Sequence, residues 1–350
     1  MKKCILYKKL GNNIVECTAC SHYCKISENK TGICGVRKNQ MGDLYLLVYG
    51  KAAAAHVDPI EKKPLFHFLP GTRILSVGTI GCNFACEFCQ NWDISQATKK
   101  VKEQYKNPDE QMIQLGKMLD MGQELPPEKI VKYAVQNGIK SIAYTYNEPV
   151  IFFEYIYDTA KLAHAKGISN VFVSNGYESE EAMKKINPYL DAINIDLKSF
   201  SEDFYRKKCK ARLEPVLETI KRAHRSGIWV EITTLVIPGE NDSDEELKKI
   251  AEFIADVNKS IPWHVSRFRP DYKMMDKEAT PVETLERAYM IGREAGLKYV
   301  FTGNIHDGKE DTYCPKCDNK LVERSVYEIE IKGLEKGKCK ECRTRIAGVW

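Results

Sequence analysis

Short apolar runs and longer amphipathic stretches alternate along most of this chain. Between about residue 73 and residue 302, seven runs rich in β-branched and aromatic residues each lead into a polar or glycine-containing turn: RILSVGTI, SIAYTYNEP, NVFVSNG, AINIDLK, WVEITTLVIPG, WHVSRF and KYVFTG. Helical periodicity fills the segments between them. Strands that alternate with helices pair in parallel through right-handed crossovers. The pattern predicts an α/β protein with six or seven βα units in a partial or near-complete TIM-like barrel; an open doubly wound sheet is the alternative.

Start and stop signals mark several helix boundaries. Ser243 and Glu246 form a capping-box pattern before an apolar series, and Thr280, which a proline follows, predicts a second helix start. A polar insertion at 97–127 delays the first crossover helix and predicts a short helix around 109–121. Four glycines follow helical runs as C-terminal caps do: Gly138, Gly167, Gly227 and Gly296.

Composition limits the classes of protein that fit. The 350 residues include 53 Lys+Arg and 48 Asp+Glu, a net charge of +5, with 43% hydrophobic residues. These values are typical of a globular protein with one large domain and small appendages. We find no apolar stretch of membrane-spanning length, and the start MKKCILYKKLGNN is too short in apolar residues for a signal-peptide core. We therefore expect a cytoplasmic protein without membrane association, and the balanced charge argues against nucleic-acid binding.

The cysteines are the residues that most clearly indicate a chemical function. Eleven of the 13 cysteines fall into three groups, and only Cys4 and Cys209, to which we assign no role, stand apart. Clustered cysteines in a reducing compartment are more often metal ligands than disulfides. The sequence therefore predicts three metal or cluster sites.

The central group lies directly after the first predicted strand. Cys82, Cys86 and Cys89 form the pattern C-x3-C-x2-C within GCNFACEFCQNW. Three thiolates from one loop can each bind one iron of a [4Fe–4S] cluster, which leaves the fourth iron open to another ligand. Barrel active sites lie at the carboxyl ends of the strands, where this loop is expected. The alternatives are a three-cysteine zinc site and three buried thiols.

This motif at this position resembles the radical SAM superfamily. The segments QNWDIS, TYNEP, SNG, NIDLK and PDYKM resemble one branch, the radical SAM protein of the AmmeMemoRadiSam system, which is related to the pyruvate formate-lyase activating enzymes. The resemblance runs over nearly the whole chain. One departure is HVSRFRP, in which Arg269 stands where the family often has a second histidine.

The resemblance implies an activity and its cofactors. In such enzymes a [4Fe–4S] cluster binds S-adenosylmethionine (SAM) and cleaves it reductively to a 5′-deoxyadenosyl radical, which abstracts a hydrogen atom. It also implies an external electron donor of the flavodoxin or ferredoxin type. The predicted enzyme is thus an activase-like oxidoreductase whose substrate is a protein glycine or a small molecule.

Residues at the ends of the predicted strands are candidates to bind SAM. By resemblance, Asn147 and Glu148 occupy the segment that receives the SAM amino group, and Ser174 and Asn175 lie near its methionyl group or ribose. All four are also ordinary turn residues.

Later strands add further candidates. Asp196 and Lys198 share the polar face of AINIDLK, which predicts contact with a polar ligand. The resemblance implies that this segment lies beside SAM and the substrate, where the two residues are expected to have catalytic and SAM-binding roles; a structural ion pair is the alternative. Glu231 alternates onto the polar face of the fifth strand, Val236 is expected to line an adenine pocket, and His264 to face the same cavity. A packed core histidine is the alternative for His264.

The two outer cysteine groups have different patterns. Four cysteines near the C-terminus are spaced C-x2-C-x21-C-x2-C, which is typical of a structural zinc ribbon, with a four-cysteine iron site as the alternative: Cys314, Cys317, Cys339 and Cys342. Four near the N-terminus are spaced C-x2-C-x3-C-x9-C and fit zinc or an auxiliary iron–sulfur cluster: Cys17, Cys20, Cys24 and Cys34. Zinc is favoured there because the spacing differs from that of ferredoxins. His22 is a further metal candidate.

These sites suggest three domains and three classes of function. We expect a Cys-rich cap at 1–70, the barrel at 71–308 and a zinc-ribbon-like module at 309–350, which includes the β-rich stretch 321–333. The leading function is the radical SAM enzyme. The alternatives are an RNA-modifying protein and a non-catalytic iron–sulfur or zinc redox sensor, which would bind iron without cleaving SAM.

Overall fold

All seven predicted strands are present in the computed structural model, which describes residues 1–325 and 328–350. Val326 and Tyr327, within the expected β-rich stretch, lie outside the described residues. The seven strands are β9 (Arg73–Gly78), β11 (Ser141–Tyr144), β12 (Ser169–Ser174), β13 (Ala192–Asp196), β14 (Trp229–Val236), β15 (Trp263–Arg267) and β16 (Val300–Gly303).

The chain divides into two units, and each contains part of this strand set. The first unit comprises Met1–Asp58 and Ile74–Asp191, and the second comprises Pro59–Arg73 and Ala192–Trp350. In the first unit β9 pairs with β11 and β11 with β12, all parallel, and β8 (Ala54–Pro59) lies beside β9. In the second unit β13, β14, β15 and β16 pair in order, again all parallel. The α/β class is confirmed, whereas closure into a barrel and the three-domain division stay predictions.

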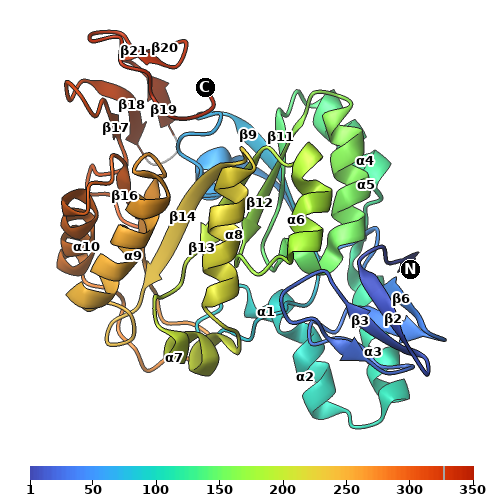
Figure 1. The fold of residues 1–350 in the computed structure, drawn as a ribbon. Coiled ribbons are helices and arrows are strands. Elements are labelled where there is room, and N and C mark those ends of the chain that lie inside the picture. The colour runs from blue at the N-terminus through green and yellow to red at the C-terminus, as the bar shows by residue number, and fades with distance from the viewer. Residues whose placement is uncertain (326–327) are drawn as a thin grey trace. The chain divides into compact units, whose positions relative to one another are not determined.

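Helices follow the strands as the periodicity predicts. The crossover helices are α4 (Pro127–Gln136), α5 (Phe153–His164), α6 (Glu180–Ile186), α8 (Glu214–Arg225), α9 (Asp244–Asn258) and α10 (Val282–Glu294). In the first unit α4 lies beside α5; in the second, α8 packs against β14, and α10 packs against β15 and β16 (Figure 1). Left-handed backbone angles confirm the four glycines that end helices: Gly138, Gly167, Gly227 and Gly296.

The predicted capping box at Ser243 is half formed, and the helix predicted to start at Thr280 has no side-chain cap. The Ser243 hydroxyl accepts from the Glu246 N–H (3.3 Å), as predicted, but the Glu246 carboxylate accepts from the Phe200 N–H (2.6 Å) instead. The helix start predicted from Thr280 and Pro281 is confirmed, since α10 begins at Val282, but Thr280 does not cap this helix. Its hydroxyl donates to the Val236 carbonyl (2.6 Å) and accepts from the Phe268 N–H (2.8 Å), so Pro281 precedes the helix without a side-chain cap.

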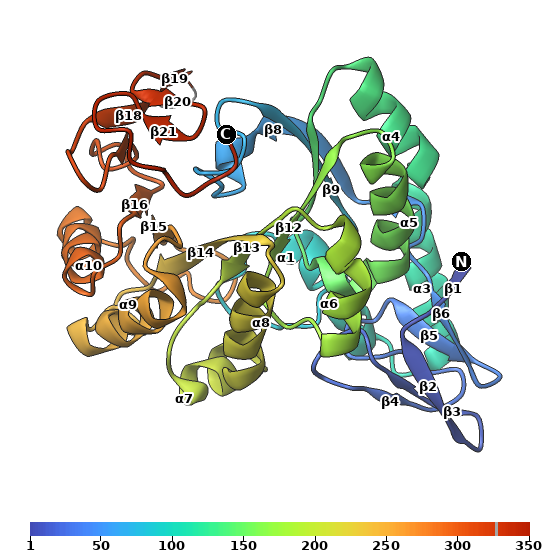
Figure 2. The same cartoon turned by 45° about the horizontal axis from the view of Figure 1, so that its top comes forward.

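The N-terminal part of the first unit is built from short antiparallel strands, blue in Figure 2. They are β1 (Lys2–Lys3), β2 (Tyr7–Gly11), β3 (Ile14–Cys17), β4 (Lys25–Ile26), β5 (Arg37–Gln40), β6 (Asp43–Leu46) and β7 (Lys51–Ala52), which pairs with β10 (Gln123–Glu124). After α1 (Trp92–Ser95), the insertion forms α2 (Ala97–Gln104) and α3 (Pro108–Met121), which confirms the helix predicted around 109–121. Arg37 joins β5 to α5 through a buried bidentate ion pair with Glu154 (2.8 and 2.9 Å).

The C-terminal module of the second unit consists of β17 (Thr312–Tyr313), β18 (Lys320–Ser325), β19 (Glu328–Ile331), β20 (Leu334–Glu335) and β21 (Lys338–Cys339). Its small core packs against Phe66 and Phe301. None of the helices in the described part of the chain is long and apolar enough to span a bilayer.

Candidate active site

The central cysteines lie on the loop that leaves β9. Cys82 and Cys86 are buried and Cys89 is partly buried. The Phe84 N–H donates to Cys82 Sγ (3.4 Å), and Lys99 Nζ from α2 donates to the Cys82 carbonyl (2.8 Å). The loop therefore has a fixed course that presents three thiols from eight consecutive residues.

This donor set fits three irons of a [4Fe–4S] cluster, because soft thiolates are the ligands that such clusters take. Burial raises the pKa of the Cys82 thiol above its usual range. Iron binding must therefore displace a proton here, since only the thiolate is a ligand. Asn147 supports the start of the loop: its Nδ2 donates to the Gly81 carbonyl (2.8 Å) and to the Thr79 hydroxyl (3.2 Å).

Glu148 is the centre of a buried polar cluster at the ends of β11 and β12. Its Oε2 accepts from the Asn175 N–H (2.9 Å), and its Oε1 from the Ser174 hydroxyl (3.0 Å) and the Val150 N–H (3.2 Å). The Ser174 hydroxyl also lies 2.6 Å from Oε1 of Glu178, which is 1% exposed. A hydroxyl has one hydrogen, so hydrogen bonds to both carboxyl groups require one of them to be protonated.

Burial, with the negative charge of Glu178 as a second cause, raises the pKa of Glu148 well above its usual value. A cation placed beside this pair would favour the ionised form and reverse the shift. The cluster is therefore suited to a positively charged ligand group.

Asn83 connects this carboxyl cluster to the cysteine loop. Asn175 Nδ2 donates to Asn83 Oδ1 (2.8 Å), and Cys82 Sγ lies 3.7 Å from the same oxygen. The structure thus brings Cys82, Glu148 and Asn175 into one network within the first unit. Three residues of this network were not predicted from the sequence: Asn83, Glu178 and Lys99. For Asn83 a signal was available, because it is a polar residue directly after Cys82 within the cysteine motif.

The remaining SAM candidates belong to the second unit. Lys198 Nζ forms an ion pair with Asp196 Oδ2 (2.8 Å) at the end of β13, and the Lys198 N–H donates to the Tyr205 hydroxyl (3.1 Å). The ion pair weighed as the alternative is therefore present. Val236 is fully buried. The catalytic and SAM-binding roles of Asp196 and Lys198, and the adenine pocket at Val236, stay predictions.

Glu231 is fully engaged by protein groups. Its Oε1 accepts from the His67 N–H (2.8 Å) and from Trp229 Nε1 (3.0 Å). Its Oε2 accepts from the Phe66 N–H (3.0 Å) and lies 2.6 Å from His264 Nε2. These contacts fill all four acceptor positions of the carboxylate, so Glu231 binds the 59–73 segment to β14 and β15. Its assignment to SAM stays a prediction.

Replacing His264 with leucine is expected to destabilise the protein by about 3–5 kcal/mol, because the buried Glu231 carboxylate loses the one contact that can carry a compensating charge among the four described. Burial by itself raises the pKa of Glu231, but the hydrogen bond and charge of His264 outweigh it and the pKa is lowered. Stability from Glu231 is thus present above about pH 4.5 and is lost as the pH falls through its lowered pKa.

Urea unfolding at several pH values measures this effect. The matched control is His224→Leu. The part-buried His224 ring lies 3.4 Å from Asn258 Nδ2, so its described contact is with an amide and not with a carboxylate. Equal stability of the two variants would contradict the role of His264.

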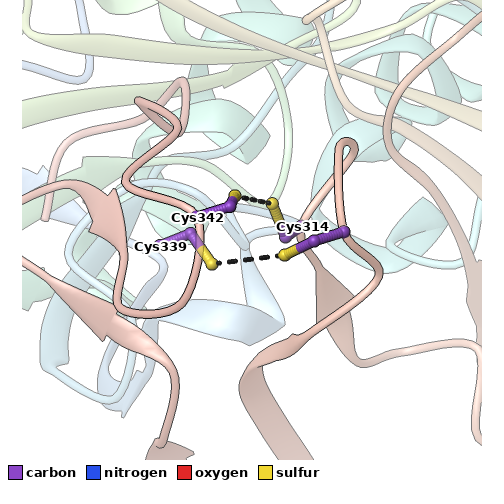
Figure 3. A group of neighbouring side chains, drawn as sticks. Cys314, Cys339 and Cys342 are labelled. Carbon is purple, nitrogen blue, oxygen red and sulfur yellow. Dashed lines mark hydrogen bonds between the residues drawn. The ribbon is translucent and has the colours of Figure 1, made fainter.

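The C-terminal cysteines lie close enough together to hold a single metal ion. The four Sγ atoms lie within 4.8 Å of one another, with 3.5 Å between Cys314 and Cys342 and 3.7 Å between Cys317 and Cys339 (Figure 3). Zinc–sulfur bonds of about 2.3 Å in a tetrahedron place the sulfurs about 3.8 Å apart. A hydrogen bond with Thr344 lowers the pKa of Cys342 to about 6, so this ligand is ready as a thiolate at neutral pH. The group can bind a metal, and zinc stays a prediction.

The fold and site together define the class: a parallel α/β protein with a three-cysteine loop after its first strand in the parallel set. The family model of the radical SAM superfamily matches residues 76–254, which include this loop and the strand ends around Glu148. The chain belongs to the radical SAM superfamily.

Relatives support this assignment over most of the chain. An uncharacterised protein of Methanocaldococcus jannaschii is 44% identical over 351 residues, which cover 99% of each chain. A pyruvate formate-lyase-activating enzyme of Clostridium pasteurianum is 23% identical over 61% of this chain and 87% of its own. A GTP 3′,8-cyclase of Helicobacter pylori is 26% identical over 73% of this chain and 80% of its own. The protein is thus related to the activating enzymes, as the sequence motifs predicted.

Proposed function

We propose that this protein cleaves SAM reductively and uses the resulting 5′-deoxyadenosyl radical to abstract a hydrogen atom from its substrate. One observation carries the proposal: in the first unit, Asn83 and Asn175 join the Cys82 loop to the buried carboxyl pair of Glu148 and Glu178. Thiols for a cluster and a carboxylate for an ammonium group thereby lie in one network.

The residues of this network have separate tasks. When bound by Cys82, Cys86 and Cys89, a [4Fe–4S] cluster would supply the single electron that breaks the SAM sulfonium bond. Glu148 accepts hydrogen bonds from the SAM amino group, and its burial strengthens that charge-assisted contact. Asn175 holds Glu148 and Asn83 at the same time. The protein thereby fixes the amino-acid end of SAM next to the cysteine loop.

The relatives support two candidate classes of substrate. Activating enzymes and a GTP cyclase are both similar to this chain, so the proposal covers two classes of substrate: a protein backbone glycine, as the activase relationship suggests, and a small molecule. An external flavodoxin- or ferredoxin-type protein supplies the electron.

The test is an anaerobic SAM-cleavage assay. The protein is reconstituted with iron and sulfide, reduced with dithionite and incubated with SAM, and 5′-deoxyadenosine is measured together with iron and zinc. Formation of 5′-deoxyadenosine supports the proposal. A reconstituted protein that binds iron but forms none, with protein extract or small-molecule pools added, would support the redox-sensor alternative instead.

Replacing Glu148 with glutamine is expected to weaken SAM binding about 10- to 100-fold, because hydrogen bonds to charged groups contribute ~1.5–3 kcal/mol. SAM binding to the natural protein should tighten as the pH rises through the raised pKa of Glu148, since only the ionised carboxylate attracts the ammonium group. Calorimetric titration across pH measures both effects. In Glu180→Gln, an exposed control, binding should be unchanged; a Glu148 variant with natural affinity and pH dependence would refute the assignment.

A further inference from the structure

The N-terminal cysteines surround a small cavity in the first unit. It is lined by Cys17, Cys20, Cys24 and Cys34, together with Arg37 and Asn83. Asn83 also belongs to the loop of the central cysteines. A single residue therefore borders both groups of thiols.

The spacing of these thiols suits a cluster better than one ion. Within residues 1–325 and 328–350, only the four C-terminal cysteines form a group of three or more possible metal ligands whose ligand atoms all lie within 4.8 Å of one another. No three N-terminal cysteines, and no three central ones, meet that distance. In an iron–sulfur cluster each thiolate binds a different iron, so the sulfurs stand further apart than around one zinc.

Two buried donors around the cavity have no acceptor. Arg37 Nε and Asn83 Nδ2 lack a hydrogen-bond partner, although both residues are 2% exposed. Buried donors without acceptors are rare in native proteins. The sulfide and thiolate sulfurs of a cluster accept such N–H groups, and these hydrogen bonds help to set its reduction potential. Thiolates bound to zinc also accept N–H groups, but a cluster adds its inorganic sulfides as further acceptors inside the cavity.

The N-terminal site directly contacts the central loop. His22 Nε2, from the segment between Cys20 and Cys24, lies 3.0 Å from the Asn83 carbonyl oxygen. A Cβ added at Gly81, whose φ is +91°, would stand 2.6 Å from the Cys34 carbonyl oxygen. The backbone at residue 34 thus leaves no room for a side chain at position 81, so only glycine fits there.

Helix α2 holds both loops at once. The Thr98 hydroxyl donates to the Cys34 carbonyl (2.9 Å), Lys102 Nζ to the Gly32 carbonyl (2.7 Å), and Lys99 Nζ to the Cys82 carbonyl (2.8 Å). The relative position of the two cysteine groups is therefore fixed by one short helix.

Building on the proposed function, we propose that Cys17, Cys20, Cys24 and Cys34 bind an iron–sulfur cluster that relays electrons to the central cluster. An external flavodoxin- or ferredoxin-type donor gives one electron to the N-terminal cluster. That electron passes to the central cluster, which is reduced as the N-terminal cluster is reoxidised. No proton is transferred and no bond forms or breaks in this step. The electron crosses the protein contacts between the two cysteine groups, so the donor does not need to reach the SAM site itself.

The first experiment tests the cluster without SAM. The triple variant Cys82→Ala, Cys86→Ala, Cys89→Ala is reconstituted anaerobically in the full chain. We expect about four irons per chain and a paramagnetic signal on reduction, as one [4Fe–4S] cluster gives. Adding Cys20→Ser and Cys24→Ser should remove both. A triple variant that holds zinc and no iron–sulfur signal would overturn the proposal, whatever the SAM-cleavage assay of the natural protein shows.

The second experiment tests the relay by following the rate at which the central cluster is reduced in the Cys24→Ser variant. Reduced flavodoxin and dithionite are compared as electron sources in rapid-freeze spectroscopy. We expect the ratio of the flavodoxin-driven to the dithionite-driven rate to fall at least about tenfold relative to the natural protein. An unchanged ratio would overturn the relay.

A further substitution keeps the test valid if Cys24→Ser does not fold. In the triple-alanine variant, Arg37→Lys should shift the reduction potential of the N-terminal cluster, because the lysine cannot reproduce the Nε donor. An unshifted potential would contradict the placement of the cluster in this cavity.

Discussion

Replacing Cys86 with alanine is expected to abolish reductive SAM cleavage. Cys86 is the middle thiol of the three and is buried, and an alanine offers no ligand atom in its place. A cluster bound by two thiolates loses iron, and the electron that breaks the sulfonium bond is no longer available. The measurement is 5′-deoxyadenosine formed under dithionite, with iron content in the same sample.

A second buried thiol supplies the control for this loss. Cys209 is fully buried, lies outside all three cysteine groups and follows Tyr205 in the second unit. Cys209→Ala removes a buried sulfur of the same size, and we expect it to keep SAM cleavage. Turnover that persists in Cys86→Ala would refute the cluster assignment, and equal loss in both variants would indicate a general effect on folding.

The sequence predicted the strands well because burial imposes a pattern on them. Each parallel strand reads as a short apolar run between turn residues, and all seven were found. The same reasoning placed Glu148 and Ser174 at neighbouring strand ends, and their hydrogen bond of 3.0 Å confirms that the two residues meet. The positions of the strands along the chain and their polar ends are thus legible from periodicity.

Contacts between distant segments were not legible in this way. Glu231 accepts from the backbone N–H groups of Phe66 and His67, more than 160 residues away, and a backbone donor leaves no trace in the side-chain pattern. Thr280 looked like a helix cap because local capping and a long-range hydrogen bond use the same hydroxyl. Glu178 was overlooked because a turn acid and a buried carboxyl partner have the same sequence signature. The polar network of the site depends on tertiary contacts that the sequence does not display.

Replacing Cys317 with alanine is expected to unfold the C-terminal module while the central cluster stays bound. The module buries few apolar side chains, chiefly Leu321, Val322 and Ile346, so its stability depends on metal binding, which contributes about 10–16 kcal/mol in small zinc domains. Cys317 is exposed, and its removal breaks the metal site without leaving a cavity in the core. Lys316→Ala, a neighbouring exposed change, should have little effect.

Three measurements separate the consequences of Cys317→Ala. Zinc content should fall from one per chain toward zero, limited proteolysis should cut within the module, and iron bound by Cys82, Cys86 and Cys89 should remain, because those ligands lie in the first unit. Phe66 and Phe301 pack against the module, so their exposure should also lower the thermal stability of the second unit. Loss of the cluster iron with an intact, protease-resistant module would contradict this division of roles, since the C-terminal site would then control the central cluster instead of stabilising its own module.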